Sequence, residues 1–191
     1  QRPAAGRVPE PVELARPAAG FVFCCFSHSY KLNPAMFAVW MRLLRQVAGS
    51  VLWLLAAKPE AEERLRREAD RCGVDPTRLV FAPRIDLAAH LARHAQADLF
   101  LDTLPFNAIT TTSVALHAGL PVLSCSGRSF AARGAGSLLQ AVGMSALVTG
   151  NLSDYEARAL ELATHPERLA SLRRALAERL QTGPLFDAER F

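Results

Sequence analysis

The sequence lacks the short motifs that mark the commonest nucleotide-binding and hydrolytic folds. No GxGxxG follows its first apolar run, and neither the GxxxxGKS/T pattern nor GxSxG occurs in the chain. These absences exclude the dinucleotide-binding fingerprint, the P-loop and the nucleophile elbow. His90 and His94 are spaced i,i+4, but no HExxH pattern and no cysteine partner accompanies them. We therefore expect no metal site and no metal cofactor.

Cysteine is scarce, and its spacing argues against disulfides and metal clusters. The four cysteines form no CxxC pair, and Cys24 and Cys25 are adjacent within an apolar run. Neighbouring residues of a strand face opposite ways, so these two thiols make neither a disulfide nor a metal pair. Buried free thiols are typical of a reducing compartment, and we expect a cytoplasmic protein.

Long apolar runs and runs of basic charge are also missing. The apolar stretches have the length of strands, and residues 1–20 lack the apolar core of a signal peptide, so we expect no membrane partner. No run of five basic residues and no interleaving of aromatic and basic residues points to nucleic acid. The net charge of +4 and the pI of about 9.2 suit either a solvated surface or an anionic ligand such as a nucleotide diphosphate.

What the sequence does contain is a regular alternation of strand-like and helical segments. Of the 191 residues, 50% are hydrophobic, which is enough for the core of one domain. Residues 1–19 are rich in proline and predict a linker or arm, so that the domain spans 20–191. We expect strands at 21–26, 51–55, 79–82, 98–101, 121–125 and 146–148, and helices at 34–47, 60–72, 86–95, 111–118, 128–141, 153–164 and 166–181. This order predicts an α/β fold with a doubly wound parallel sheet.

Ligands of such a sheet bind beyond the carboxyl ends of the strands, so the residues after each strand are the candidates for a site. Lys31 follows the first strand and is placed to meet a phosphate, although a solvated surface lysine fits its position equally well. The run Thr110–Thr112 meets a helix start after the strand at 98–101. Backbone N–H groups and hydroxyls there can hold an anion, and N-capping by one threonine is the plainer alternative. The helix expected at 86–95 has Asp86 as its N-cap, and either His90 or His94 on it can hydrogen-bond a base.

Six ordered motifs run along nearly the whole chain from about residue 20. They stand at Phe26–Pro34, Ser50–Leu55, Ala97–Thr103, 107–111, Ala118–Val122 and Gly183–Asp187. Together they resemble the O-linked N-acetylglucosamine transferase and SPINDLY family. The resemblance implies a Rossmann-like C-terminal domain of a GT-B glycosyltransferase that binds a nucleotide sugar. It implies inverting, metal-independent transfer of N-acetylglucosamine from UDP-N-acetylglucosamine to Ser or Thr of a protein acceptor.

The resemblance also assigns roles to single residues of this sequence. Lys31 matches the lysine that contacts the donor diphosphate, and it is the expected catalytic residue because it would stabilise the leaving nucleotide. The other expected donor-binding residues match family positions around the same ligand. They are His28 near the donor, His90 and Arg93 at the uracil end, and Asn107, Thr110, Thr111 and Thr112 at the pyrophosphate turn.

Two positions depart from the family pattern. Ile109 stands where the family has a His against the donor phosphates, and Val114 where it has an Asp that accepts hydrogen bonds from the ribose hydroxyls. Losing one such acceptor costs about 1.5–3 kcal/mol, or roughly ten- to a hundredfold in binding. The resemblance further implies a second, N-terminal catalytic half and tetratricopeptide repeats, and the sequence contains neither.

Three alternatives to an active UDP-N-acetylglucosamine enzyme therefore stay open. The first is a degenerate, non-catalytic module that binds nucleotide sugars or acts as a scaffold, for which Ile109 and Val114 are the evidence. The second is a SPINDLY-like transferase that uses GDP-fucose. The third is an unrelated doubly wound nucleotide-binding domain, and the missing GxGxxG makes it the weakest of the three.

Overall fold

The computed structural model describes residues 20–182 as a six-stranded sheet covered by helices. Every strand pair is parallel, and the strand order is β3-β2-β1-β4-β5-β6. The strands are β1 (Val22–Cys25), β2 (Val51–Leu55), β3 (Leu79–Ala82), β4 (Leu99–Leu101), β5 (Val122–Cys125) and β6 (Val148–Thr149). The predicted α/β fold with a doubly wound parallel sheet is confirmed. The arm expected at 1–19 and the motif at Gly183–Asp187 lie outside the described residues.

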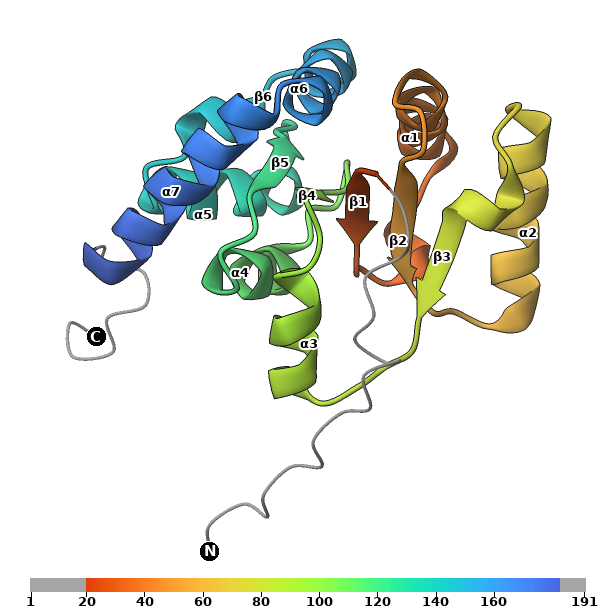
Figure 1. Cartoon of the computed structure of the whole chain (residues 1–191), viewed down its shortest axis with the longest axis horizontal. Coiled ribbons are helices and arrows are strands. Elements are labelled where there is room, and N and C mark those ends of the chain that lie inside the picture. Colours follow the sequence, from red (N-terminus) through yellow and green to blue (C-terminus); the bar gives the residue numbers. More distant parts are fainter. Residues whose placement is uncertain (1–19, 183–191) are drawn as a thin grey trace, which may run out of the picture.

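Helices cover both faces of the sheet, which explains why the central strands read as continuous apolar runs. Each residue of β1 is at most 1% exposed. In Figure 1, α1 and α6 lie on one side of the sheet, and α3 and α4 lie on the other. The helices are α1 (Pro34–Gln46), α2 (Pro59–Arg71), α3 (Leu87–His94), α4 (Ile109–His117), α5 (Gly134–Ala141), α6 (Leu152–Thr164) and α7 (Pro166–Thr182).

The sequence itself dictates where several helices begin. Asn33 caps α1 by accepting a hydrogen bond from the Met36 N–H at 3.0 Å, and Pro34 occupies the first turn. The predicted cap of α3 is confirmed, because the Asp86 carboxylate accepts from the Ala89 N–H at 2.9 Å. These caps fix where the segments after β1 and β3 turn into helices, and both segments lie at the carboxyl edge of the sheet.

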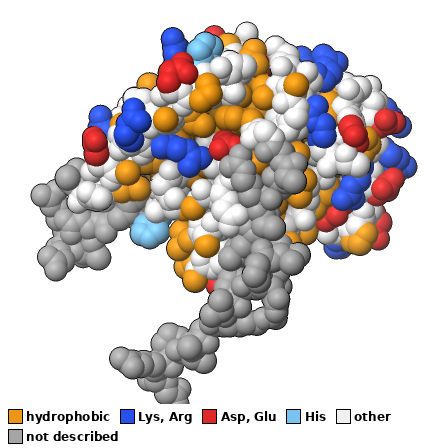
Figure 2. All heavy atoms as spheres, viewed as in Figure 1, with side chains coloured by type: hydrophobic (Ala, Val, Ile, Leu, Met, Phe, Trp, Pro, Cys, Tyr) orange, Lys and Arg blue, Asp and Glu red, His pale blue; other side chains and the backbone are white. Residues whose placement is uncertain are grey.

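Much of the basic charge lies on the surface beside acidic residues. Figure 2 shows Lys or Arg and Asp or Glu side chains interleaved at the right of the molecule, where Figure 1 places α2. Ion pairs one helical turn apart join side chains of this helix. They are Arg66–Glu62 at 3.6 Å, Arg67–Glu63 at 3.7 Å and Arg71–Glu68 at 3.3 Å. The basic composition therefore gives no argument for a ligand until the positions of single cations are considered.

Two predicted elements contain a 3-10 turn that was not expected. The helix expected at 128–141 is a 3-10 turn (Phe130–Ala132) followed by α5, because loop N–H groups take two carbonyl oxygens of its first half. Asn107 N–H donates to the Ala131 oxygen and Gly127 N–H to the Ala132 oxygen, both at 2.8 Å. The strand expected at 146–148 is mostly a second 3-10 turn, Ser145–Leu147, and only then β6. A short buried apolar run does not reveal its conformation by periodicity.

The strand order places a crevice at the centre of the sheet. From β1 the chain builds outward to β3, and α3 then carries it back to β4 on the other side of β1. The loops after β1 and β4 thus leave neighbouring strands in opposite directions, which is where open α/β sheets bind ligands. Within 20–182, no helix combines the length and hydrophobicity that a membrane span needs.

Candidate functional site

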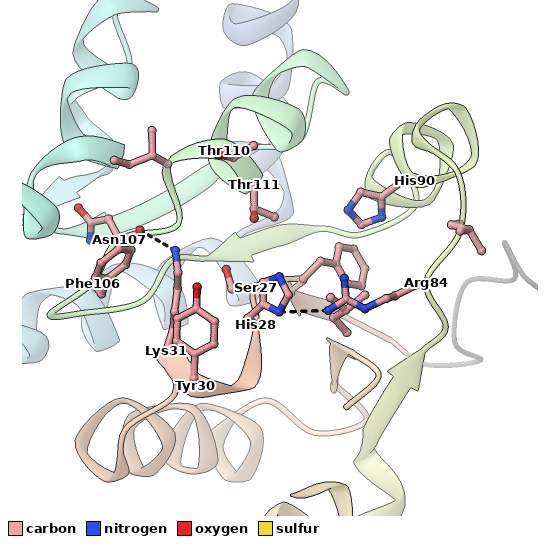
Figure 3. Close-up of a pocket in the computed structure, with 14 residues that line it drawn as sticks. Ser27, His28, Tyr30, Lys31, Arg84, His90, Phe106, Asn107, Thr110 and Thr111 are labelled. Atoms are coloured by element: carbon pink, nitrogen blue, oxygen red, sulfur yellow. Dashed lines mark hydrogen bonds between the residues drawn. The ribbon is translucent and has the colours of Figure 1, made fainter. Parts of the chain in front are cut away.

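A pocket of about 590 Å³ opens at the carboxyl edge of the sheet, beside the β1–β4 pair. Its walls come from the segments that follow β1, β3 and β4, together with the end of β2 (Figure 3). The lining residues are Phe26, Ser27, His28, Tyr30, Lys31, Leu55, Arg84, Ile85, His90, Phe106, Asn107, Ile109, Thr110 and Thr111. Six of the residues expected at the donor therefore line one pocket: His28, Lys31, His90, Asn107, Thr110 and Thr111.

Lys31 is held in place across the crevice. It ends the 3-10 turn Ser29–Lys31, and its ammonium donates to the Asn107 carbonyl oxygen at 3.0 Å and lies 4.3 Å from the centre of the Phe106 ring. Partial burial lowers the pKa of Lys31, while the nearby negative charge of Asp102 opposes that shift. An ammonium has three N–H donors, so Lys31 keeps donors for a ligand anion.

Asp102 anchors the loop that Lys31 contacts, although it does not line the pocket. Its carboxylate accepts from the Ala108 N–H at 2.8 Å and from the Ser124 hydroxyl at 2.6 Å, and its side chain is 0% exposed. Burial raises the pKa of Asp102 to about 6, and these hydrogen bonds limit the rise. The group is therefore mainly ionised at pH 7 and shapes the loop between β4 and α4.

The threonine run lies inside α4 rather than before it. The helix begins at Ile109, and its N-cap Ala108 makes no side-chain hydrogen bond, so capping by a threonine does not occur. Thr110 and Thr111 face the pocket from the first turn, where backbone N–H groups have no intrahelical acceptor. Thr112 is 0% exposed and does not line the pocket.

Asn107 contributes its backbone rather than its side chain. The side-chain amide donates to the Thr103 oxygen at 2.8 Å and is 0% exposed, so it supports the loop. Its Oδ1 and the Ser27 hydroxyl are buried without a hydrogen-bond partner among the described residues. Ser27 lines the pocket and is 6% exposed.

Aromatic and histidine rings line much of the rest of the pocket. His90 lies 5.4 Å from the Phe26 ring, and His28 stacks on Tyr30 with ring centres 5.4 Å apart. Arg93 does not reach the pocket. Its side chain is 0% exposed and donates to the Pro83 carbonyl oxygen at 2.8 Å, so it stabilises the segment after β3 from inside the domain.

Sequence reasoning did not select several of the lining residues. Ser27 and Tyr30 stand inside a motif already singled out, so their position after β1 was an available signal. Arg84 and Ile85 follow β3 in the same way. No sequence pattern singles out Phe106, because it lies in a loop whose path depends on the hydrogen bond from the Ala108 N–H to Asp102. In the part of the chain that the structure describes, no three His, Cys, Asp or Glu side chains gather as metal ligands would.

Acid should destabilise the chain through His94, which packs under the pocket. Its Nδ1 lies 2.7 Å from the His90 carbonyl oxygen, and burial lowers its pKa to about 3. The unfolded chain takes up this proton near pH 6.5, so the stability from neutral His94 is complete above that pH and is lost as the pH falls toward 3. The loss between pH 7 and pH 5 is about 2 kcal/mol.

Urea denaturation of the native chain and His94→Gln at both pH values measures this effect. The destabilisation caused by the substitution should shrink by about 2 kcal/mol at pH 5. Asp102, whose pKa is raised, stabilises both proteins as the pH falls and cancels in the difference. A penalty that is the same at both pH values would contradict the prediction.

Comparison with known proteins agrees with the fold. The sequence model of glycosyl transferase family 41 matches residues 10–191. The chain is 34% identical over 184 residues to the probable UDP-N-acetylglucosamine–peptide N-acetylglucosaminyltransferase SEC of Arabidopsis thaliana, covering 96% of this chain and 19% of that protein. It is 33% identical to the probable transferase SPINDLY of Solanum lycopersicum, covering 90% of this chain and 19% of the relative.

A solved structure shares both sequence and fold. A mutant of the Thermobaculum terrenum O-GlcNAc transferase superposes with a TM-score of 0.82 at 32% identity, covering 91% of this chain and 34% of that one. The chain thus spans about a fifth of the length of these curated relatives and a third of the solved protein. With the parallel sheet, the crevice and the matched motifs, these likenesses show that the chain belongs to glycosyl transferase family 41, the family of the O-GlcNAc transferases and SPINDLY.

Proposed function

We propose that this chain is the donor-binding part of a protein O-glycosyltransferase that uses UDP-N-acetylglucosamine. The observation that carries the proposal is the pocket beside the β1–β4 pair, where Lys31 faces the first turn of α4. A cation and a helix N-terminus together favour a diphosphate. The names of the relatives, which are UDP-N-acetylglucosamine–peptide transferases, support the choice of nucleotide and sugar.

The geometry suggests how the pocket would act on the donor. The diphosphate would lie between Lys31 and Thr110–Thr111, and the nucleoside would extend toward His90. When the sugar leaves, negative charge grows on the diphosphate, and Lys31 and the first turn of α4 are already in place to stabilise it. This chemistry requires no metal ion from the pocket.

The complete reaction needs parts beyond this chain. We propose that a second, N-terminal half of the enzyme supplies the acceptor side, that tetratricopeptide repeats precede it, and that the acceptor is a Ser or Thr hydroxyl of a protein. Cys24, Cys25, Cys72 and Cys125 are all free. Free thiols fit a reducing compartment, and we propose the cytoplasm.

One observation favours a second candidate, a nucleotide-sugar-binding module without transfer activity. Ile109 occupies the family's phosphate-facing His position and lines the pocket, where it packs on α5 so tightly that a Cβ at Gly134 would clash with it. An isoleucine donates no hydrogen bond to a phosphate. Val114, at the family's ribose-binding position, does not line the pocket.

Isothermal titration calorimetry of the chain with UDP, UDP-N-acetylglucosamine and GDP tests the donor site. We expect UDP and its sugar conjugate to bind with Kd below about 1 mM, and GDP to bind about tenfold more weakly. Absence of binding for every nucleotide at millimolar concentration would rule out the donor site. Tighter binding of GDP would favour the GDP-fucose alternative. Tight UDP binding without transfer by the longer protein would favour the non-catalytic module.

A further inference from the structure

Arg84 is a second cation on the pocket wall, and neither the motifs nor the family match assigns it a role. It follows β3, two residues beyond the end of the strand, and its side chain is exposed. Its guanidinium lies 3.1 Å from the His28 Nδ1. In Figure 3, Ser27 and His28 lie between Lys31 and Arg84, and His90 lies above Arg84 at the same end of the pocket.

The charged residues that line the pocket are basic. Lys31 and Arg84 are cations, and none of the described residues that line the pocket is an Asp or a Glu. Asp102, the carboxylate whose charge acts on Lys31, is buried and accepts hydrogen bonds from Ala108 and Ser124. Two cations on separate segments, with no carboxylate between them, favour a ligand with two negative groups.

The bond between Arg84 and His28 leaves the guanidinium available. Both side chains are exposed, so the bond exchanges easily with water or with a ligand. A guanidinium has five N–H donors and no acceptor, and it prefers the oxygen atoms of phosphates and carboxylates. Only one of its donors faces His28 in this arrangement.

We propose that Arg84 binds the phosphate next to the nucleoside, while Lys31 binds the phosphate next to the sugar. The inference rests on the proposed function, because it names which part of the donor each cation meets. The order of the two phosphates follows from the pocket: Arg84 lies at the end that holds His90, where we propose the nucleoside binds, whereas Lys31 lies by Asn107. Arg84 thereby supplies, from the opposite wall, a phosphate contact that Ile109 does not make.

Truncated ligands separate the two contacts. UDP carries both phosphates, UMP carries only the one next to the nucleoside, and uridine carries none. We expect Arg84→Gln to weaken UDP and UMP by about tenfold each and to leave uridine unchanged. Lys31→Ala should weaken UDP much more than UMP. Arg174→Gln, which removes one exposed arginine on α7 outside the pocket, is the matched control for net charge and should change nothing.

Calorimetry gives the UDP affinities, and ligand-observed NMR gives those of UMP and uridine. The dependence of UDP affinity on NaCl is an independent readout, since a lost ionic contact should make Arg84→Gln less sensitive to salt than the native chain. Unchanged UDP affinity in Arg84→Gln would overturn the inference. So would an equal weakening of uridine, which would place Arg84 at the base. If the native protein does not bind UDP, the proposed function is wrong. If the native protein binds UDP but Arg84→Gln does not weaken UDP and UMP, only the inference about Arg84 is wrong.

Discussion

Lys31→Ala should weaken UDP binding to this chain by about ten- to a hundredfold. The ammonium is fixed across the crevice by the Asn107 oxygen and the Phe106 ring, so it pays little ordering entropy when a diphosphate arrives. A hydrogen bond to a charged group contributes about 1.5–3 kcal/mol, which corresponds to this range of affinity. In a longer protein that carries both halves of the enzyme, kcat for sugar transfer should fall by about 10²–10³-fold, because the charge to be stabilised grows in the transition state.

The other lysine of the chain provides the control. Lys58 is exposed at the N-terminus of α2 and does not line the pocket, so Lys58→Ala removes the same charge and should leave UDP affinity and transfer unchanged. Calorimetry measures the affinity, and transfer of labelled sugar to a protein acceptor measures kcat. Equal behaviour of the two variants would remove Lys31 from the donor site.

The second large effect concerns the stability of the loop that Lys31 contacts. Asp102→Ala should lower the free energy of unfolding by about 2–4 kcal/mol, because it leaves the Ala108 N–H and the Ser124 hydroxyl buried without their acceptor. Asp102→Asn should cost only about 1 kcal/mol, since the amide oxygen keeps one acceptor and burying a neutral group is cheaper. Urea denaturation at pH 7 measures both variants.

The pH dependence gives this prediction a second test. The raised pKa of Asp102, about 6, means that its contribution to stability is complete below its unfolded pKa and is lost as the pH rises through 6. The free energy of unfolding of Asp102→Asn should therefore be closer to that of the native protein at pH 7 than at pH 5. Equal losses in the alanine and asparagine variants would show that the carboxyl oxygens do not anchor the loop.

Most of the fold follows from local signals in the sequence. The strands 51–55 and 79–82 have the predicted bounds, and the cap Asp86 starts α3 as expected. These features depend on apolar runs and on one side chain near its own backbone, which a sequence displays directly. The break at Phe130–Ala132 was missed because its cause is a hydrogen bond from a loop more than twenty residues earlier in the chain, at Asn107.

For the site, the sequence by itself determined which chain segments contribute, but not which side chains of those segments face the pocket. It placed Lys31, His90 and the threonine run after the first, third and fourth strands, and the parallel order of the sheet then brings them to one edge. Only the tertiary structure decided that Thr110 and Thr111 face the pocket while Thr112 and Arg93 are buried beneath it. The helix begins at Ile109, two residues before the expected start at 111, so Thr110 and Thr111 belong to its first turn. Successive residues of a helix point about 100° apart, so neighbouring threonines cannot all face the pocket, and only the packing of α4 on the sheet selects which ones do.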